Sequence, residues 1–125
     1  MIAADTSSFV AYFAGEKARD TLLINEAIND GILILPPPVL LEMLSDPNLP
    51  LELEKALLDL PLIAVSAVVW KNAGKMRAYF IKQKGKSRLA DSLIASFCIT
   101  EKIPLITRDH DFNKYCEHFR LLILK

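Results

Sequence analysis

Carboxylates that follow apolar segments are the residues of this chain whose types and spacing suit metal chemistry. Asp5 follows a short apolar run at the N-terminus, and Asp109 follows the run IPLIT within the stretch IPLITRDHDF. Glu42 lies just beyond a proline turn, and Asp91 lies near the start of a helical pattern. Parallel strands bring their C-terminal ends to one edge of a sheet, where ligand sites form. We therefore expect these four acids to meet at one edge.

The chemistry expected of such a cluster is metal-assisted hydrolysis. Crowded carboxylates repel one another, so at least one holds a proton unless a cation neutralises the group. Hard oxygen ligands favour Mg²⁺ or Mn²⁺ over zinc, and a metal-bound water can be activated toward a phosphodiester. Asp111 is an additional candidate ligand. His110 and His118 lack partners for nucleophilic catalysis, and we assign His110 no chemistry.

Each acid also has an explanation that involves no metal. Asp5 is a candidate N-cap for the helix that follows it, in competition with Ser7 or Ser8. Glu42 suits a solvated helix position, and Asp91 suits the first turn of a helix, where the dipole favours an acid. The two aspartates of RDHDF could share capping of a helix. In the metal reading, Asp111 does the capping while Asp109 faces the ion. The joint placement, rather than any single acid, carries the metal hypothesis.

Apolar patterns predict the elements that position these acids. Short apolar runs, several of them bounded by Gly or Pro, predict buried strands at Ile2–Ala4, Ile32–Leu35, Leu62–Val65, Ile103–Thr107 and Leu121–Leu124. Helical spacing predicts helices over Glu16–Asn29, Leu51–Leu60, Ala67–Lys84 and Leu89–Glu101. The prolines at 36–38 favour an abrupt turn into a further helix that carries Leu40, Leu41, Glu42 and Leu44. Alternating strands and helices indicate an α/β fold, a three-layer α/β/α sandwich around a mostly parallel sheet. An all-helical bundle is the alternative, which β-branched runs bounded by Gly and Pro disfavour.

Composition limits the class of protein without deciding its partner. The 125 residues predict a single domain spanning 1–125, and a hydrophobic fraction of 52% supplies a core. Fifteen basic and fifteen acidic residues cancel, so net charge neither favours nor excludes a polyanion. No uncharged stretch reaches the roughly 20 residues of a membrane span. Two lone cysteines, Cys98 and Cys116, suit reduced thiols, so we expect a cytoplasmic protein.

Three segments resemble one known family. They are IAADTSSFVAYF, LILPPPVLLEML and KGKSRLADSLIASFCITEKIPLITRDHDF. In this order and at these distances they resemble the motifs of the PIN-domain ribonucleases, and most closely those of the VapC-like toxins of toxin–antitoxin pairs. The resemblance covers nearly the whole chain.

The resemblance implies a site, a cofactor and partners. It assigns the catalytic and metal-binding positions to Asp5, Glu42, Asp91 and Asp109, with Asp111 as a variable fifth. Ser7 and Thr107 are then expected to hydrogen-bond the carboxylates. It also implies a PIN-like five-stranded parallel sheet, Mg²⁺ or Mn²⁺, an RNA substrate, a homodimer and inhibition by a cognate antitoxin protein.

Basic residues near the acids suggest how RNA is held. Cations alternate along IKQKGKSRL and recur beside the last acid, which makes Lys84, Lys86, Arg88 and Arg108 candidates for binding phosphates. The alternative is a solvated loop after a helix C-terminus. Trp70, Tyr79 and Phe80 could stack on bases, but their helical spacing favours core packing.

The predicted function is a metal-dependent endoribonuclease, with other classes kept as alternatives. A phosphatase of the haloacid-dehalogenase kind normally carries a second acid two residues after the first, where this chain has Ser7. A phosphate-accepting receiver domain requires paired acids near Asp5 and a late Lys, where this chain has Arg108. The remaining alternative is a catalytically inactive PIN-like module that binds RNA or protein without cutting.

Overall fold

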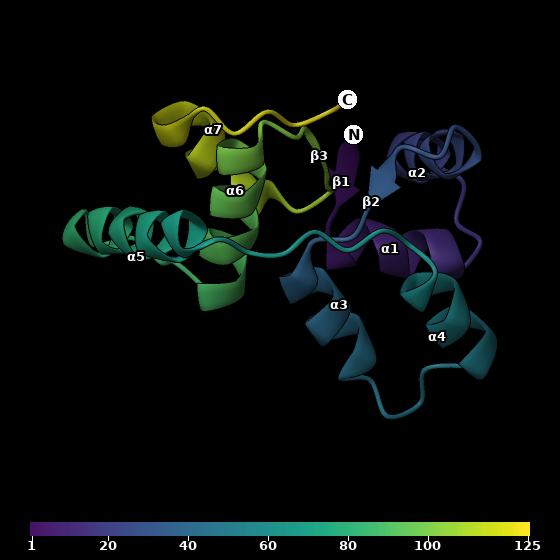
Figure 1. Cartoon of the computed structure of the whole chain (residues 1–125). Coiled ribbons are helices and arrows are strands. Elements are labelled where there is room, and N and C mark those ends of the chain that lie inside the picture. Colours follow the sequence, from purple (N-terminus) through teal and green to yellow (C-terminus); the bar gives the residue numbers. More distant parts are fainter.

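The parallel strands and seven α-helices of this chain are seen in a computed structural model that describes residues 1–125 (Figure 1). In chain order the elements are β1 (Ile2–Ala4), α1 (Thr6–Phe13), α2 (Arg19–Asn29), β2 (Leu33–Ile34), α3 (Pro37–Leu44), α4 (Leu51–Leu58), α5 (Ala67–Lys82), α6 (Leu89–Glu101), β3 (Leu105–Ile106), the 3-10 helix η1 (His110–Phe112) and α7 (Asn113–Phe119). No helix combines the length and the apolar character that a membrane crossing needs.

The sheet places β1 at its centre. Its three strands have the order β2-β1-β3 and all pair in parallel. Ala3 is opposite Ile34 on one side and Leu105 on the other. Because the strands run the same way, the segments that leave β1 and β3 emerge together at one edge. Asp5 and Thr107 are the first residues beyond those two strands.

The sheet has fewer full strands than the five implied by the resemblance. Three of the five predicted strands form, while the other two are reduced to single parallel bridges, Leu35 with Leu62 and Leu105 with Ile123. Both bridges lie where the outer strands were expected. Beside the first bridge, Pro36 follows Leu35 and Pro61 precedes Leu62, and proline has no N–H to extend a ladder. The class of fold is as predicted.

Helices cover both faces of this sheet. In Figure 1 the strands lie between α2 on one side and α6 with α7 on the other, and α5 packs outside α6. Helix α6 is buried on most of its surface because it contacts both α5 and α3. Its side chains Ile94 and Phe97 are 1% and 0% exposed, and Ser96 Oγ donates to the carbonyl of Val69 at 2.7 Å. This packing fixes the N-terminal turn of α6, which carries Asp91.

Three helix ends differ from the sequence expectation. Helix α4 ends at Leu58, two residues before the predicted Leu60. Helix α2 begins at Arg19 rather than Glu16, and it ends as predicted before Gly31, whose φ of +69° suits glycine. Helix α5 ends at Lys82, two residues early, and the left-handed residue is Lys84 (φ +61°) rather than Gly85. The basic segment 83–88 is therefore a loop that leads directly into α6.

Candidate metal centre

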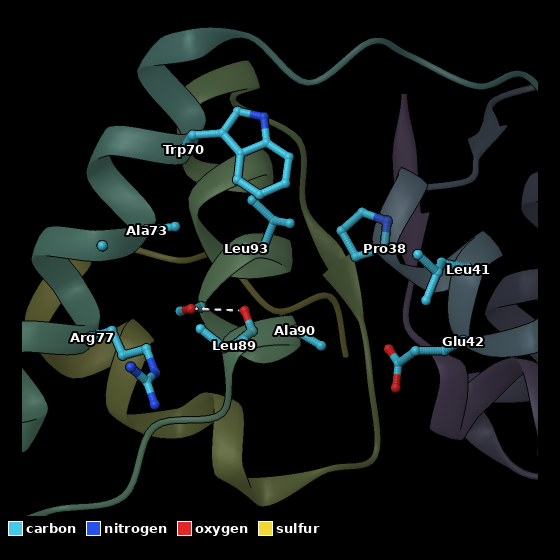
Figure 2. A pocket seen from close by; sticks show the side chains of 11 residues that line it. Pro38, Leu41, Glu42, Trp70, Ala73, Arg77, Leu89, Ala90 and Leu93 are labelled. Carbon is cyan, nitrogen blue, oxygen red and sulfur yellow. Dashed lines mark hydrogen bonds between the residues drawn. The ribbon is translucent and has the colours of Figure 1, made fainter. Parts of the chain in front are cut away.

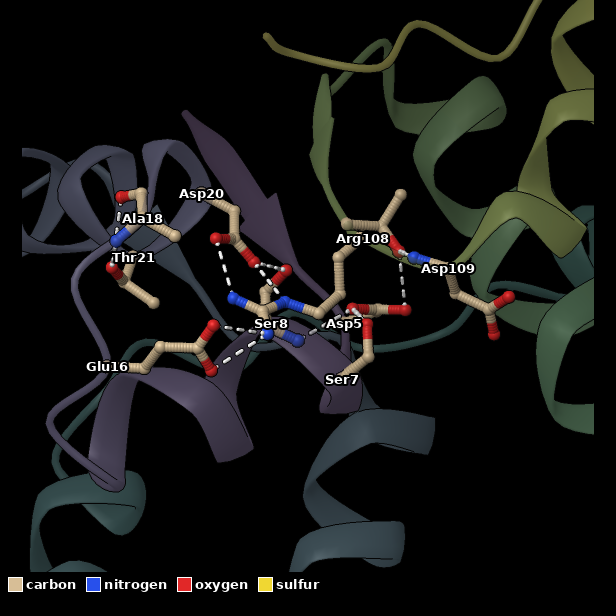
Figure 3. Close-up of polar contacts among 10 residues, drawn as sticks. Asp5, Ser7, Ser8, Glu16, Ala18, Asp20, Thr21, Arg108 and Asp109 are labelled. Carbon is tan, nitrogen blue, oxygen red and sulfur yellow. Dashed lines mark hydrogen bonds and ion pairs between the residues drawn. The ribbon is translucent and has the colours of Figure 1, made fainter.

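Asp5 both caps a helix and lines the site, so the two readings of this residue are not alternatives. Its Oδ1 atom accepts hydrogen bonds from the backbone N–H of Ser8 at 3.2 Å and from Ser7 Oγ at 2.7 Å (Figure 3). The backbone N–H of Asp5 donates to the carbonyl of Ile106 at 3.1 Å. The residue is only 4% exposed. Burial raises the pKa of Asp5, while the bonds from Ser7, Thr107 and Ser8 oppose that rise.

Thr107 connects the exits of the two strands. Its Oγ1 donates to Asp5 Oδ2 at 2.7 Å and accepts from the backbone N–H of Asp109 at 3.0 Å. With Ser7 on Oδ1 and Thr107 on Oδ2, both oxygens of Asp5 are oriented by hydroxyl groups. Both residues thus make the hydrogen bonds that the sequence resemblance implies for them.

The four acids meet at one cavity. A hollow of about 230 Å³ is lined by Asp5, Thr6, Ser7, Glu42, Arg88, Asp91, Ile94 and Asp109. Asp5 and Asp109 follow adjacent strands, whereas Asp91 comes from the first turn of α6 and Glu42 from α3. Glu42 is exposed, and its Oε1 accepts from Thr6 Oγ1 at 3.1 Å. Four segments distant in sequence therefore supply oxygen donors to one space.

Asp111 joins this cluster through its carboxylate. Oxygen atoms of Asp91, Asp109 and Asp111 all lie within 4.8 Å of one another. The expectation that Asp111 caps the helix that follows is wrong. Asp109 is the cap, because its Oδ1 accepts from the backbone N–H of Asp111 at 2.9 Å, and η1 begins at the next residue. Asp109 nevertheless lines the cavity.

The electrostatics of the cluster favour a cation. Burial, followed by repulsion from Asp109, raises the pKa of Asp91 to about 6, while Arg88 acts in the opposite direction. The donor set contains carboxylate oxygens and no His or Cys ligand. Such a set fits a hard divalent ion and does not fit a zinc site built from nitrogen or sulfur. The residues present therefore fit Mg²⁺ or Mn²⁺.

The predicted basic residues fall into two groups. Lys84, Lys86 and Arg88 are exposed on the loop before α6, and Arg88 also lines the acidic cavity. Arg77 Nε donates to the carbonyl of Ser87 at 2.9 Å and holds this loop against α5. Arg108 differs, because its guanidinium is paired with Asp20 and Glu16 at 2.8 and 2.9 Å. We therefore exclude Arg108 from the candidate RNA-binding residues.

An apolar groove lies beside the acidic cavity, and sequence reasoning missed it. The groove, of about 340 Å³, runs between α3 and the pair α5–α6, and Glu42 borders both it and the cavity (Figure 2). Trp70 lines it and is 59% exposed, so the prediction that Trp70 packs in the core is wrong. Phe80 is buried as predicted, at 5% exposure. Helical spacing alone could not distinguish these two aromatic residues.

A parallel sheet that gathers carboxylates at its C-terminal edge defines a class of α/β domains with an acidic site. Within that class the sequence matches the PIN domain over residues 2–118, and the chain belongs to the PIN domain family. The family resemblance read from the sequence motifs is confirmed. A comparison with curated proteins gives no match.

Three solved structures are similar to this chain in fold. One is the structure of VapBC2 from Rickettsia felis bound to a DNA fragment from the VapBC2 promoter. It has a TM-score of 0.72 at 22% identity, and the match covers 99% of this chain and 98% of that chain. FitAcB from Neisseria gonorrhoeae has a TM-score of 0.73 at 15% identity, covering 100% and 97%. VapBC-5 from Mycobacterium tuberculosis, a member of the VapBC family of toxin–antitoxin systems, has a TM-score of 0.69 at 15% identity, covering 99% and 97%. At these identities the likeness establishes the fold.

Proposed function

We propose that this protein is a metal-dependent endoribonuclease that hydrolyses RNA phosphodiester bonds. One observation carries the proposal: four carboxylates from four separate segments line one cavity of a PIN domain. Helix capping explains Asp5 and Asp109 individually, but it does not explain why Asp91 and Glu42 face the same space. Burial, and then the neighbouring carboxylates, raise the pKa of Asp91, and a cluster of this kind is suited to a cation.

The residues of the cavity have separable roles in this proposal. Asp5, Asp91, Asp109 and Glu42 hold Mg²⁺ or Mn²⁺, and Asp111 is an additional ligand. The bound ion would supply an activated water and stabilise the leaving oxygen of the phosphodiester. Below about pH 6, where Asp91 is mostly protonated, its proton would have to leave for an ion to bind, because a protonated carboxyl is a poor ligand. Ser7 and Thr107 fix the direction in which the Asp5 carboxylate points.

The direct test of the proposal is cleavage of RNA by the purified protein. A panel of single-stranded and structured RNAs is incubated with Mg²⁺, with Mn²⁺ and with EDTA. We expect cleavage only with a divalent ion. Cleavage that persists in EDTA would reject the mechanism. RNA binding without cleavage, together with no divalent affinity by calorimetry, would favour the inactive binding module instead.

Thr107 provides a test of carboxylate orientation. Thr107→Val keeps the shape of the side chain but removes the hydroxyl that donates to Asp5 Oδ2. We expect kcat to fall by about 10–100-fold, as for other partners that orient metal ligands. Thr107→Ser retains the hydroxyl and is the matched control, with kcat close to that of the wild type. A loss of kcat in Thr107→Ser, with kcat retained in Thr107→Val, would show that packing of the methyl group, rather than the hydrogen bond, is what matters.

The basic loop provides a test of phosphate binding. We propose that Lys84, Lys86 and Arg88 contact the RNA backbone, since they are exposed and lead into the helix that carries Asp91. Replacing Lys84 and Lys86 together with glutamine should weaken RNA binding and lower the slope of log K against log salt by about 1–2. Fluorescence anisotropy at several salt concentrations measures the slope. Lys55→Gln, at an exposed position of α4, is the control, and an unchanged slope in the double variant would remove the loop from the interface.

We further propose that the protein acts in the cytoplasm, as a homodimer, and is inhibited by an antitoxin. The support is its PIN fold and the likeness to the VapBC and FitAcB structures. Growth arrest on expression of this chain alone, relieved by the product of the neighbouring reading frame, is expected. Sedimentation that shows only monomer would remove the dimer.

A further inference from the structure

Arg108 forms a charged clamp outside the metal cavity. Its guanidinium binds both oxygens of Asp20, with Nε to Oδ2 at 2.8 Å and Nη2 to Oδ1 at 2.9 Å (Figure 3). Nη1 also reaches Glu16, at 2.9 Å to Oε2 and 3.1 Å to Oε1. Arg108 lies between Thr107, which orients Asp5, and Asp109, which lines the cavity. The clamp thus holds the segment that leaves β3.

Asp20 is at the same time connected to the segment that leaves β1. Its Oδ2 accepts from Ser8 Oγ at 2.9 Å, and Ser8 is fully buried in the first turn of α1. The backbone N–H of Ser8 is the one that donates to Asp5 Oδ1. One carboxylate on α2 therefore receives hydrogen bonds from both strand exits that carry acids of the cavity. Asp20 does not itself line the cavity.

The clamp is built to persist at working pH. Hydrogen bonds from Arg108 lower the pKa of Asp20 to about 2, so this carboxylate stays ionised. Two parallel N–H···O bonds from a guanidinium fix orientation as well as distance. The Asp20 side chain is 13% exposed, against 51% for Glu16, so solvent screens the Glu16 pair more strongly. The ion pair of Arg108 with Asp20 is therefore stronger than its ion pair with Glu16.

We propose that Asp20 is a positioning residue of the metal centre, which holds Asp5 and Asp109 in register by bonding Ser8 and Arg108. The inference rests on the proposed function for its consequence in catalysis. Asp20 lies outside the three sequence motifs. Its contacts form only when α2 packs beside both strand exits, so the sequence did not indicate them. Loss of Asp20 removes no candidate metal ligand, but it frees the two segments that carry Asp5 and Asp109.

Metal affinity is the first test. We expect Asp20→Ala to weaken Mn²⁺ binding to the folded protein by about tenfold in calorimetry, and to lower kcat for RNA by a similar factor. Asp20→Asn, which keeps an acceptor for Ser8 but loses the ion pair, should give a smaller loss. Glu26→Ala, an exposed acid of the same helix, should bind Mn²⁺ as the wild type does. Ile24→Val destabilises α2 at a buried position without touching the clamp, and it controls for loss of stability.

Amide hydrogen exchange in the metal-free protein tests the inference separately from the nuclease proposal. We expect the amides of Ser8 and Asp109 to exchange about tenfold faster in Asp20→Asn than in the wild type, and at the wild-type rate in Glu26→Ala. Unchanged exchange at both amides, or Mn²⁺ affinity in Asp20→Ala equal to that of Ile24→Val, would overturn the positioning role. A wild type that binds no Mn²⁺ would refute the proposed function, whereas the exchange result would still decide whether Asp20 holds the two segments.

Discussion

Asp91→Asn is expected to lower RNA cleavage by about 10³-fold or more while raising the thermal stability of the metal-free protein. A loss of that size corresponds to roughly 4 kcal/mol of transition-state stabilisation, as expected for a ligand that both holds the ion and carries negative charge. The stability should rise because the folded protein no longer buries a carboxylate, and no longer holds it beside the like charge of Asp109. The gain is expected to be about 1–2 kcal/mol at pH 7.5, since solvent screens part of the repulsion.

Two measurements check this pair of effects. Single-turnover cleavage with Mn²⁺ gives the loss of activity, and calorimetric unfolding in EDTA gives the change in stability. Glu101→Gln, at the exposed C-terminal end of the same helix, is the matched control and should change neither quantity appreciably. Cleavage within tenfold of the wild type would show that Asp91 is a helix acid with no part in the chemistry.

Metal binding is expected to stabilise the protein strongly at pH 8 and much less at pH 5. At a Mn²⁺ concentration of 100 times its Kd at pH 8, the free energy of unfolding should rise by about 2.7 kcal/mol. Because the pKa of Asp91 is raised to about 6, binding displaces a proton below that pH. Each pH unit then weakens binding by up to tenfold, so the same ion concentration should add only about 1.4 kcal/mol at pH 5.

In the metal-free protein, the contribution of Asp91 to stability should change with pH in the opposite direction. A carboxyl whose pKa is raised on folding stabilises the protein most when it is protonated. The contribution of Asp91 is fully present below its ordinary pKa of 3.8 and is lost as pH rises through about 6. Unfolding in EDTA and in Mn²⁺, each followed from pH 4.5 to 8, separates the two trends. An equal stabilisation by Mn²⁺ at pH 5 and pH 8 would contradict a site that contains a protonated acid.

The hydrophobic pattern predicted the architecture well because the apolar character of each segment and its spacing are local properties of the sequence. The strands at the N-terminus, before the proline cluster and before Thr107 all form, since each is an apolar run bounded by residues that stop it. The two outer runs form only single bridges. Beside the first of these bridges, Pro36 and Pro61 lack the N–H donors that would extend the ladder, and the apolar pattern alone does not account for that loss.

The candidate site was predictable in its residue list but not in its contacts. Asp5, Glu42, Asp91 and Asp109 were chosen because each lies near a strand end or a helix start, and the structure brings all four to one cavity. Which of the last two aspartates caps the 3-10 helix could not be decided, because both have suitable spacing. The atoms that orient Asp5 come from a residue 102 positions away.

Arg108 shows where sequence reasoning stops. As a cation beside an acidic residue it suited RNA binding, yet the fold places it against Asp20 and Glu16, 88 and 92 positions away. By itself the sequence determined the order of elements, the class of fold and the acids available to a cation, because these depend on local pattern and residue type. The tertiary structure alone decided which charges are free and which are paired, because charge pairing depends on distances of a few ångströms between segments that only packing brings together.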